Sequence, residues 1–374
     1  MNRSCVVALA LCLTGRAWAD DAHNRCAAPH PHTGAAVSIP KDDAVHLGPD
    51  GKPSVVYDQW YWNAVLLGDD GHVYGVETIP FQFYFAPTII DVTQIALTDV
   101  ANDEYLNQFV FGGGDGYRFV PDGIDIEIAD SGGALKAVGG GGSDELTLTY
   151  ADGSTAQLHF EGAKNPSPAW ADGVGQMIDP VTGRDHGTQF YYNRRNMVTY
   201  GTIQRPGKRR VNVIGTGWYD REFGSVIGTR GSQDNNVNWR WLSLHLSDDT
   251  DVMMWDMYAN DTGNNLLHFL NEIGQAPACA EKTTTHYTFT PSTSTVVAAG
   301  PPASRLNLGG HLSVPEDGLE IDIRPLTSKQ IVSSGGLFSP FFEGGFLASG
   351  TKHGRPVAGT GYYEEFVRPG GCCQ

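Results

Sequence analysis

Short segments in which apolar and polar residues alternate run along the chain from residue 55 to residue 366. The first two, Asp58–Leu67 and His72–Phe85, are separated by Gly68-Asp69-Asp70-Gly71, which is typical of a tight hairpin turn. Similar segments, with turn residues between them, recur roughly every 8 to 12 residues. Because alternation places every second side chain on the same face of a strand, the pattern predicts an all-β fold of sandwiches or barrels.

The number of these segments favours two β domains in tandem. A chain of 374 residues is long enough to bury two cores. We place the boundary at Arg205-Pro206-Gly207, so that residues 54–205 form an N-terminal domain and residues 206–374 a C-terminal domain, after an extended leader over residues 20–53. Gly263–Ile273 is the one segment for which we expect a helix.

The first 19 residues are typical of a secretory signal peptide. Arg3 supplies the charged start, Cys5–Thr14 is a short apolar run, and Ala17-Trp18-Ala19 is a small-residue cleavage site. An apolar run of about ten residues is too short to cross a bilayer as a helix. We therefore expect cleavage after Ala19 and a secreted or periplasmic protein with no membrane span.

The charge of the chain argues against nucleic acid as a partner. Loss of Arg3 and Arg16 with the signal would change the formal charge from −17 to about −19 (−17 − 2). Such a chain lacks the basic surface that neutralises phosphates. The one basic run, Lys208-Arg209-Arg210, is expected in an exposed loop.

No pattern in the sequence predicts a metal or an organic cofactor. Cys26, Cys279, Cys372 and Cys373 would remain after cleavage, and their spacing does not fit a zinc site. In an exported protein they are candidates for disulfides, whose pairing stays open. The histidines are scattered, and the sequence holds no P-loop, nucleophile elbow or H-E-x-x-H motif.

The stretch Gly215–Gly224 contains the first candidate acid. In a strand, Trp218, Asp220 and Glu222 share one face, and Tyr219 lies on the other. Burial against Trp218 would raise the pKa of Asp220 and make it a proton donor. Alternatively, Asp220 accepts backbone hydrogen bonds at a structural corner.

The second candidate acid is Asp256, which lies in the apolar segment Val252–Tyr258. A carboxylate in such a strand is costly unless it is protonated or paired. A hairpin with the preceding segment would bring Asp256 near Trp239 or Trp241, with His245 as an accessory acid–base group. The alternatives are a salt bridge to Arg240 and an acid that faces outward.

Aromatic residues are dense enough to line a ligand cavity, although they could equally fill a barrel core. The candidates for substrate binding are Trp60, Tyr61, Trp62, Glu77, Phe81, Tyr191, Tyr192, Trp218, Trp255 and Tyr362, and Tyr219 is added to the catalytic candidates.

The order of several motifs resembles the hydroxyneurosporene synthase family, also called carotenoid 1,2-hydratases. They are Gly75-Val76-Glu77, Tyr191-Tyr192-Asn193-Arg194, Gly215–Gly224, Trp239-Arg240-Trp241 and Gly354–Glu364. The resemblance covers residues 58–366 and implies two lipocalin-like (calycin) domains. The chain is also similar to secreted fungal hydratases such as kievitone hydratase and to fungal Diels–Alderases.

In that family, the resemblance implies, an aspartate protonates a C=C bond without a cofactor, assisted by a His-x-Trp pair and a tyrosine. The aspartate would correspond to Asp256, with Asp220 as its rival. Trp239 and Trp241 occupy the positions of the pair, and Met254 stands where the tyrosine is expected. We therefore expect a secreted hydratase of a prenyl or polyene group on a hydrophobic small molecule. A pericyclic cyclase or isomerase, and a non-catalytic binder of lipophiles, are the alternatives.

Overall fold

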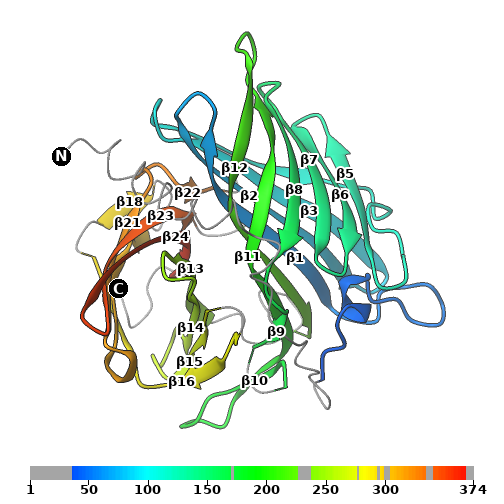
Figure 1. Ribbon diagram of the computed structural model, residues 1–374. Coiled ribbons are helices and arrows are strands. Elements are labelled where there is room, and N and C mark those ends of the chain that lie inside the picture. Colours follow the sequence, from blue (N-terminus) through cyan, green and yellow to red (C-terminus); the bar gives the residue numbers. More distant parts are fainter. Residues whose placement is uncertain are drawn as a thin grey trace.

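The computed structural model describes residues 36–169, 172–225, 237–275, 278–292, 295–298, 304–333 and 340–367. The proposed signal peptide, Cys26, Cys372 and Cys373 lie outside these residues. Two large antiparallel sheets make up most of the described chain and lie side by side as separate curved bodies (Figure 1). The described helices are two short 3-10 helices, η1 (Lys41–Asp43) and η2 (Pro315–Asp317). None of the described helices has the length or apolar character needed to cross a bilayer.

The first sheet has the strand order β4-β3-β2-β1-β12-β11-β8-β7-β6-β5, and β9 and β10 also pair with β11. Its strands are β1 (Tyr57–Gly68), β2 (Val73–Phe85), β3 (Thr88–Asp99), β4 (Glu104–Phe111), β5 (Ile124–Asp130), β6 (Gly133–Gly140), β7 (Ser143–Tyr150), β8 (Thr155–Gly162), β9 (Ser167–Pro168), β10 (Val174–Ile178), β11 (Asp185–Gln204) and β12 (Arg210–Gly224).

The second sheet has the order β16-β15-β14-β13-β24-β23-β21-β20-β17, and β22 also pairs with β23. Its strands are β13 (Val237–Leu246), β14 (Asp251–Ala259), β15 (Asn265–Ile273), β16 (Glu281–Thr284), β17 (Thr288–Pro291), β20 (Gly310–Val314), β21 (Leu319–Pro325), β22 (Ile331–Val332), β23 (Phe341–Lys352) and β24 (Arg355–Phe366). A separate two-stranded sheet joins β18 (Thr295–Ala298) to β19 (Ser304–Asn307).

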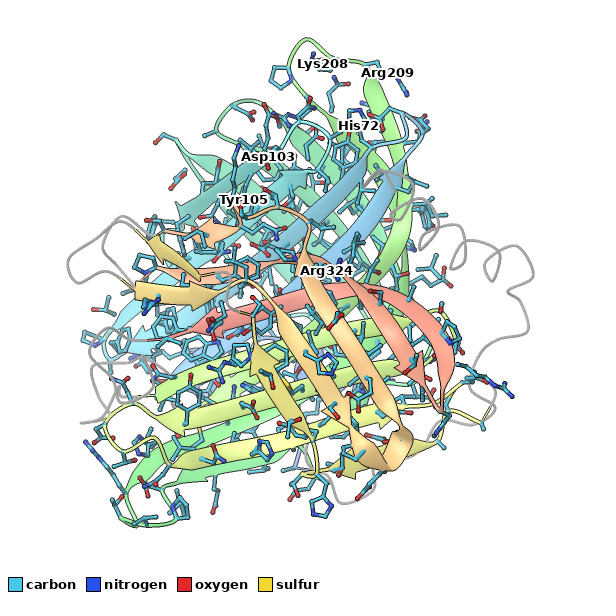
Figure 2. All side chains as sticks on the ribbon, turned by 90° about the vertical axis from the view of Figure 1, so that its left-hand side faces the viewer. His72, Asp103, Tyr105, Lys208, Arg209 and Arg324 are labelled. Atoms are coloured by element: carbon cyan, nitrogen blue, oxygen red, sulfur yellow. The ribbon has the colours of Figure 1, made fainter. Side chains whose placement is uncertain are left out.

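The all-β expectation is confirmed, and so is the hairpin at residues 68–71, which joins β1 to β2. Two features differ from the expectation. Gly263–Ile273 was expected to be helical but contributes β15, because pairing with β14 and β16 outweighs a weak local helical pattern. Arg205-Pro206-Gly207 forms the turn between β11 and β12, so the first sheet continues to Gly224. Lys208 and Arg209 lie at the exposed tip of this hairpin, as expected for the basic run (Figure 2).

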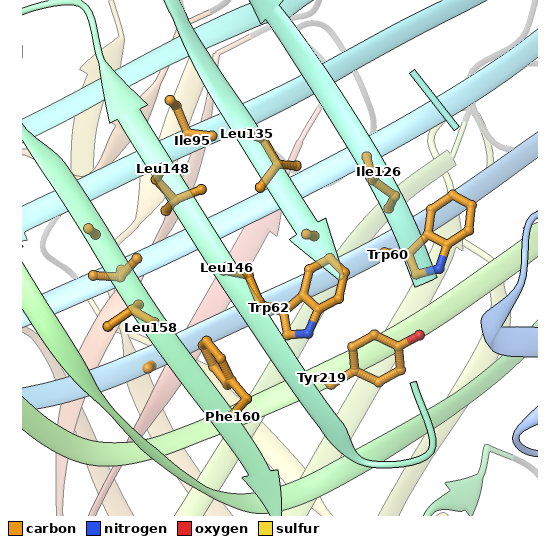
Figure 3. Close-up of a cluster of buried hydrophobic side chains, with 14 of the residues drawn as sticks. Trp60, Trp62, Ile95, Ile126, Leu135, Leu146, Leu148, Leu158, Phe160 and Tyr219 are labelled. Atoms are coloured by element: carbon orange, nitrogen blue, oxygen red, sulfur yellow. The ribbon is translucent and has the colours of Figure 1, made fainter. Parts of the chain in front are cut away.

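Alternation explains why the first domain has a core of its own. Apolar side chains from both ends of the first sheet, including Ile95 of β3, Leu135 of β6 and Leu148 of β7, meet inside the curved sheet with Trp60 and Trp62 (Figure 3). Each is almost completely buried. Burial of a large apolar side chain contributes about 1.5–3 kcal/mol, so this cluster holds the sheet in its curved form.

The second sheet encloses a comparable core around Leu242, Leu244, Ile321 and Phe346. The second sheet also presents its other face to the first domain. A third buried cluster, made of residues from both sheets, fills the space between them. Because a strand offers two faces, β13, β14 and β24 serve both the second core and this contact between the domains.

Candidate active site

The contact between the domains is unusually rich in aromatic side chains, and we call it the interdomain layer. It consists of side chains from β1, β2, β11 and β12 that face β13, β14, β23 and β24. Tyr61 packs edge-on against Trp241 with ring centroids 5.5 Å apart, and Trp218 packs against the same indole at 6.0 Å. Tyr191 contacts Trp255 at 4.8 Å. Indole and phenol faces therefore come from both domains.

The two domains approach closely at a glycine of the first sheet. A Cβ atom built on Gly75 of β2 would lie 2.8 Å from the hydroxyl oxygen of Tyr362 of β24. A side chain at this position would force Tyr362 to shift within the contact between the sheets. Gly75 belongs to the Gly75-Val76-Glu77 motif of the sequence, which gives this motif a physical role.

Five acidic side chains lie in or beside this layer, and we call them the carboxyl cluster. Glu77, Asp220 and Glu222 come from the first sheet, and Glu343 and Glu364 come from the second. Burial is the largest cause of a raised pKa in every member, and the charge of Glu364 adds to it in the other four. Low polarity and mutual repulsion therefore keep protons on the four members other than Glu364 near neutral pH.

Asp220 has the geometry of a positioned acid. Its Oδ1 accepts hydrogen bonds from the Tyr191 hydroxyl and from Trp218 Nε1, both at 2.5 Å. Burial raises the pKa of Asp220 to about 8, and these hydrogen bonds and the nearby Arg195 only partly oppose the rise. Because both donors converge on Oδ1, the proton of the neutral acid resides on Oδ2. Trp241 Nε1 donates to the Tyr191 hydroxyl at 3.3 Å, so the hydrogen-bond network around Asp220 continues into the second domain.

Glu77 and Glu343 form a carboxyl pair that spans the two domains. Gln94 Nε2 lies 3.0 Å from Glu77 Oε1 and 3.0 Å from Glu343 Oε2. The Tyr105 hydroxyl also donates to Glu77, at 3.1 Å. Burial raises the pKa of Glu77 to about 8, and burial together with the charge of Glu77 raises that of Glu343 well above its usual range. The pair therefore holds protons between the sheets.

Glu222 and Glu364 complete the cluster in different settings. Glu222 accepts hydrogen bonds from Gln59 and Gln189, and burial raises its pKa well above the usual range. Glu364 is partly exposed, as is its neighbour Trp239. Burial raises the pKa of Glu364 to about 7, and a hydrogen bond from Trp239 partly opposes this rise. Glu364 is thus the member of the cluster that both contacts water and changes its charge near neutral pH.

The structure brings most of the sequence candidates together in this layer. Tyr61, Glu77, Tyr191, Trp218, Asp220, Trp241, Trp255 and Tyr362 are buried there, and Phe81 and Trp239 pack against it. His245 is at its edge, where its Nδ1 lies 2.6 Å from Asp251 and its ring centroid lies 5.6 Å from that of Trp218.

Four candidates belong to the core of the first domain instead. Trp60, Trp62, Tyr192 and Tyr219 alternate with layer residues along their strands and therefore point to the opposite face. Trp62 Nε1 donates to Asp144 at 3.0 Å, and the Tyr219 hydroxyl donates to Asp43 at 3.0 Å. These four residues therefore fill the barrel core, which was the alternative to lining a ligand cavity.

Asp256 does not lie beside the two tryptophans. In the backbone register of the β13–β14 hairpin, Trp239 lies opposite Met257, Trp241 opposite Trp255 and Asp256 opposite Arg240. Paired residues project from the same face, so Asp256 points into the second domain's own core. There it accepts a hydrogen bond from the Tyr287 hydroxyl at 2.5 Å and lies 2.7 Å from His268 Nδ1. The ion pair of Arg240 is with Glu365, at 2.8 Å, and not with Asp256 as the alternative assignment expected.

Four residues of the site were not among the candidates predicted from the sequence: Glu222, Glu343, Gln94 and Tyr105. One signal for Glu343 was present, because it follows Phe341-Phe342 as a lone acid in an apolar run. The same cost of burial that drew attention to Asp256 applies to Glu343. No comparable signal marks Gln94 or Tyr105, whose roles depend on partners in distant strands.

The described residues contain no cluster of His, Cys, Asp and Glu arranged for a metal ion. Cys279 is buried and disulfide-bonded. The groups that the layer does present are neutral carboxylic acids, carboxylates and aromatic faces, which are suited to proton transfer to an apolar substrate.

The raised pKa of Asp220 predicts that stability falls with rising pH. Between its ordinary pKa of 3.8 and its folded value of about 8, the folded protein keeps a proton that the unfolded chain has released. The contribution to the free energy of unfolding is fully present below about pH 4 and is lost as the pH rises through about 8. Urea unfolding at about pH 5 and about pH 9 should show a smaller loss in Asp220→Asn than in the wild type. Equal losses would contradict a raised pKa.

Residues 30–365 match the model of a family described as AttH-like. The chain belongs to the AttH-like family. Its fold is similar to that of an AttH protein from Nitrosomonas europaea, with a TM-score of 0.70 and 22% sequence identity over 90% of this chain and 98% of that one. It is also similar to kievitone hydratase from Nectria haematococca, with a TM-score of 0.67 and 14% identity over 92% and 97%. No curated protein matches the sequence significantly.

The membership in the AttH-like family, with these two structural neighbours, confirms the family resemblance inferred from the sequence motifs. The shared fold also supports the expectation of two tandem lipocalin-like domains. At these identities the likeness concerns the fold. The chemistry of this AttH-like protein has to be argued from its own interdomain layer.

Proposed function

We propose that this protein is a hydratase that adds water to a C=C bond of a prenyl or polyene group, with Asp220 as the acid. The observation that carries the proposal is a neutral carboxylic acid, held at Oδ1 by Tyr191 and Trp218, within an aromatic layer. A hydrophobic substrate fits the apolar character of this layer. The kievitone hydratase neighbour supports a hydratase in general.

The reaction has three steps: protonation of the double bond, addition of water and loss of a proton. Asp220 transfers the proton on Oδ2 to one carbon of the double bond, which leaves a tertiary carbocation and the Asp220 carboxylate. The faces of Trp218, Trp241 and Tyr61 stabilise the cation without forming a bond to it. Water then adds to the tertiary carbon and loses a proton to a carboxylate of the cluster. The cluster ends with the number of protons with which it began, so one molecule of water has been added.

The carboxyl cluster also supplies the acceptor for that last proton. Glu364 is suited to it because it is partly exposed and its pKa is about 7. An acid at Asp220 and a carboxylate at Glu364 would operate together near neutral pH, each in the protonation state that it needs. Export through residues 1–19 is part of the proposal and would place the reaction outside the cytoplasm.

Labelled water tests the proposed reaction. Purified protein is incubated in ¹⁸O-water with the lipophilic ligand extracted from it and with a panel of prenylated phenols and isoprenoid polyenes, kievitone included. We expect a hydrated product that carries the label at the new hydroxyl group. An unlabelled isomer would instead indicate a cyclase or isomerase, and an unchanged extracted ligand would indicate a binding protein.

A further inference from the structure

Arg195 is a buried cation in the interdomain layer without a carboxylate partner. It follows Tyr191 and Asn193 on the face of β11 that points toward the second domain, and it is completely buried. Its Nε donates to Asn193 Oδ1 at 2.6 Å, and its Nη1 donates to the backbone oxygen of Asn271 of β15 at 3.0 Å. Arg195 therefore contacts both domains through neutral oxygen atoms.

Two other buried arginines each form an ion pair, whereas Arg195 does not. Arg194 forms an ion pair with Asp43, and Arg221 forms one with Asp58 at 2.5 Å. Among the described residues, Glu281, Asp251 and Asp220 act on Arg195 through their charge without forming an ion pair with it, and its Nη2 has no hydrogen-bond partner there. An arginine side chain stays protonated in proteins, and an unpaired buried charge is costly. The guanidinium thus offers a free donor in a place where proteins seldom leave one.

Two neighbours of Arg195 are also incompletely paired. Asn193 Nδ2 and Asn271 Oδ1 are buried and have no hydrogen-bond partner among the described residues. Both asparagines contact Arg195, so their free atoms belong to the same hydrogen-bonded group. Two free donors, on Arg195 and Asn193, suit an oxygen atom that carries negative charge.

This group lies one indole ring away from the proposed acid. The guanidinium carbon of Arg195 stands 5.2 Å from the centre of the Trp218 ring, and Trp218 Nε1 donates to Asp220. Asn193 is also the cross-strand partner of Asp220 in the β11–β12 pair. A molecule held at Arg195 would therefore extend along Trp218 toward Asp220.

We propose that Arg195 and Asn193 form a head-group subsite for an anionic oxygen of the substrate, such as a carboxylate or an ionised enol or phenol. The inference rests on the proposed function, because it places the reacting double bond at Asp220 and the anionic head beyond Trp218. The substrate is then an amphiphile with an isoprenoid or polyene tail and an acidic head. Protons on Asp220 and Glu77 reduce the negative charge that such an anion meets in the layer.

Matched ligands test the subsite without any turnover. Farnesoic acid and farnesol share one isoprenoid tail and differ only in the head group. Titration against the tryptophan fluorescence of the purified protein should give a dissociation constant about tenfold to hundredfold lower for the acid, the range expected of one charge-assisted contact. In Arg195→Gln this preference should disappear, while the affinity for farnesol should stay the same.

Three further variants serve as controls for the ligand titration. Arg324→Gln removes the same charge from an exposed side chain of the second sheet and should keep the preference (Figure 2). Asp220→Asn should also keep it, which separates the subsite from the proposed catalysis. Asn193→Asp would give the guanidinium a carboxylate partner, so this variant should stay folded and lose the preference even if Arg195→Gln does not fold. Equal affinity for the two ligands in the wild type, or a preference that survives in Asn193→Asp, would overturn the proposal.

Discussion

Replacement of Asp220 by asparagine is expected to lower kcat for water addition by about 10²–10⁴-fold, the usual contribution of a positioned general acid. The amide oxygen can still accept the hydrogen bonds from Tyr191 and Trp218, so the packing of the layer is retained. The amide cannot transfer a proton to carbon. Activity is measured as ¹⁸O incorporation, and substrate affinity is followed in parallel and should change little. Wild-type activity should also fall as the pH rises through about 8 and Asp220 ionises.

Asp256→Asn is the matched control. It makes the same chemical change in the adjacent domain, on the face of β14 that points away from the interdomain layer. Its partners, the Tyr287 hydroxyl and His268, lie in the second domain. We expect kcat to be unaffected. Loss of activity in Asp256→Asn, with full activity in Asp220→Asn, would move the acid into the core of the second domain and contradict the assignment.

Replacement of Arg194 by glutamine is expected to destabilise the protein by about 3–5 kcal/mol, the usual cost of removing one partner from a buried ion pair. Arg194 forms an ion pair with Asp43 of η1 and approaches Asp144 of β7 to 3.6 Å. All three side chains are almost completely buried in the first domain. Glutamine would leave two carboxyl groups without their counter-charge. Urea unfolding followed by tryptophan fluorescence measures the change.

An exposed arginine gives the comparison for that experiment. Arg118 forms two hydrogen bonds with Asp125, at 2.8 and 2.6 Å, on the surface of the same domain. Solvent screens this pair, so Arg118→Gln should cost less than about 1 kcal/mol. Similar losses in the two variants would show that burial does not set the importance of Arg194.

The Arg194 network also shows why the N-terminal segment folds onto the barrel. Asp43 accepts hydrogen bonds from the hydroxyl groups of Tyr192 and Tyr219 as well as from Arg194. Asp43 belongs to the segment that we expected to be an extended leader, and η1 thus brings a carboxylate into the core of the first domain. Nothing in the local sequence around Asp43 indicates these partners, because all of them lie about 150 residues or more further along the chain.

The alternation of polar and apolar residues predicted many of the strands and the direction in which the side chains of one strand point. The period of two along Trp218–Phe223 placed Trp218, Asp220 and Glu222 on one face and Tyr219 on the other, and the structure shows the same division. The hairpin at residues 68–71 follows from its glycine and aspartate residues. In contrast, the weak helical pattern of Gly263–Ile273 was overridden by its strand neighbours.

The errors at the site have a common cause. The prediction that Asp256 lies near Trp239 or Trp241 depended on the register of one hairpin. A one-residue change in that register moves every side chain of the strand to the opposite face of the sheet. In the β1 strand, Tyr61 faces the second domain while Trp60 and Trp62 face the first core. Local sequence could not decide between these faces, because both are buried.

Residue order alone is enough to predict that the chain forms alternating strands and that an acid shares a face with Trp218. Those properties depend on the geometry of a single strand, in which side chains alternate regardless of what lies above them. Only the tertiary structure decided which faces meet between the domains. Tyr191 reaches Asp220 through the β11–β12 pair, and Glu77 meets Glu343 because two separate sheets pack together. Such contacts join residues far apart in the chain, and the raised pKa values follow from the burial that this packing creates.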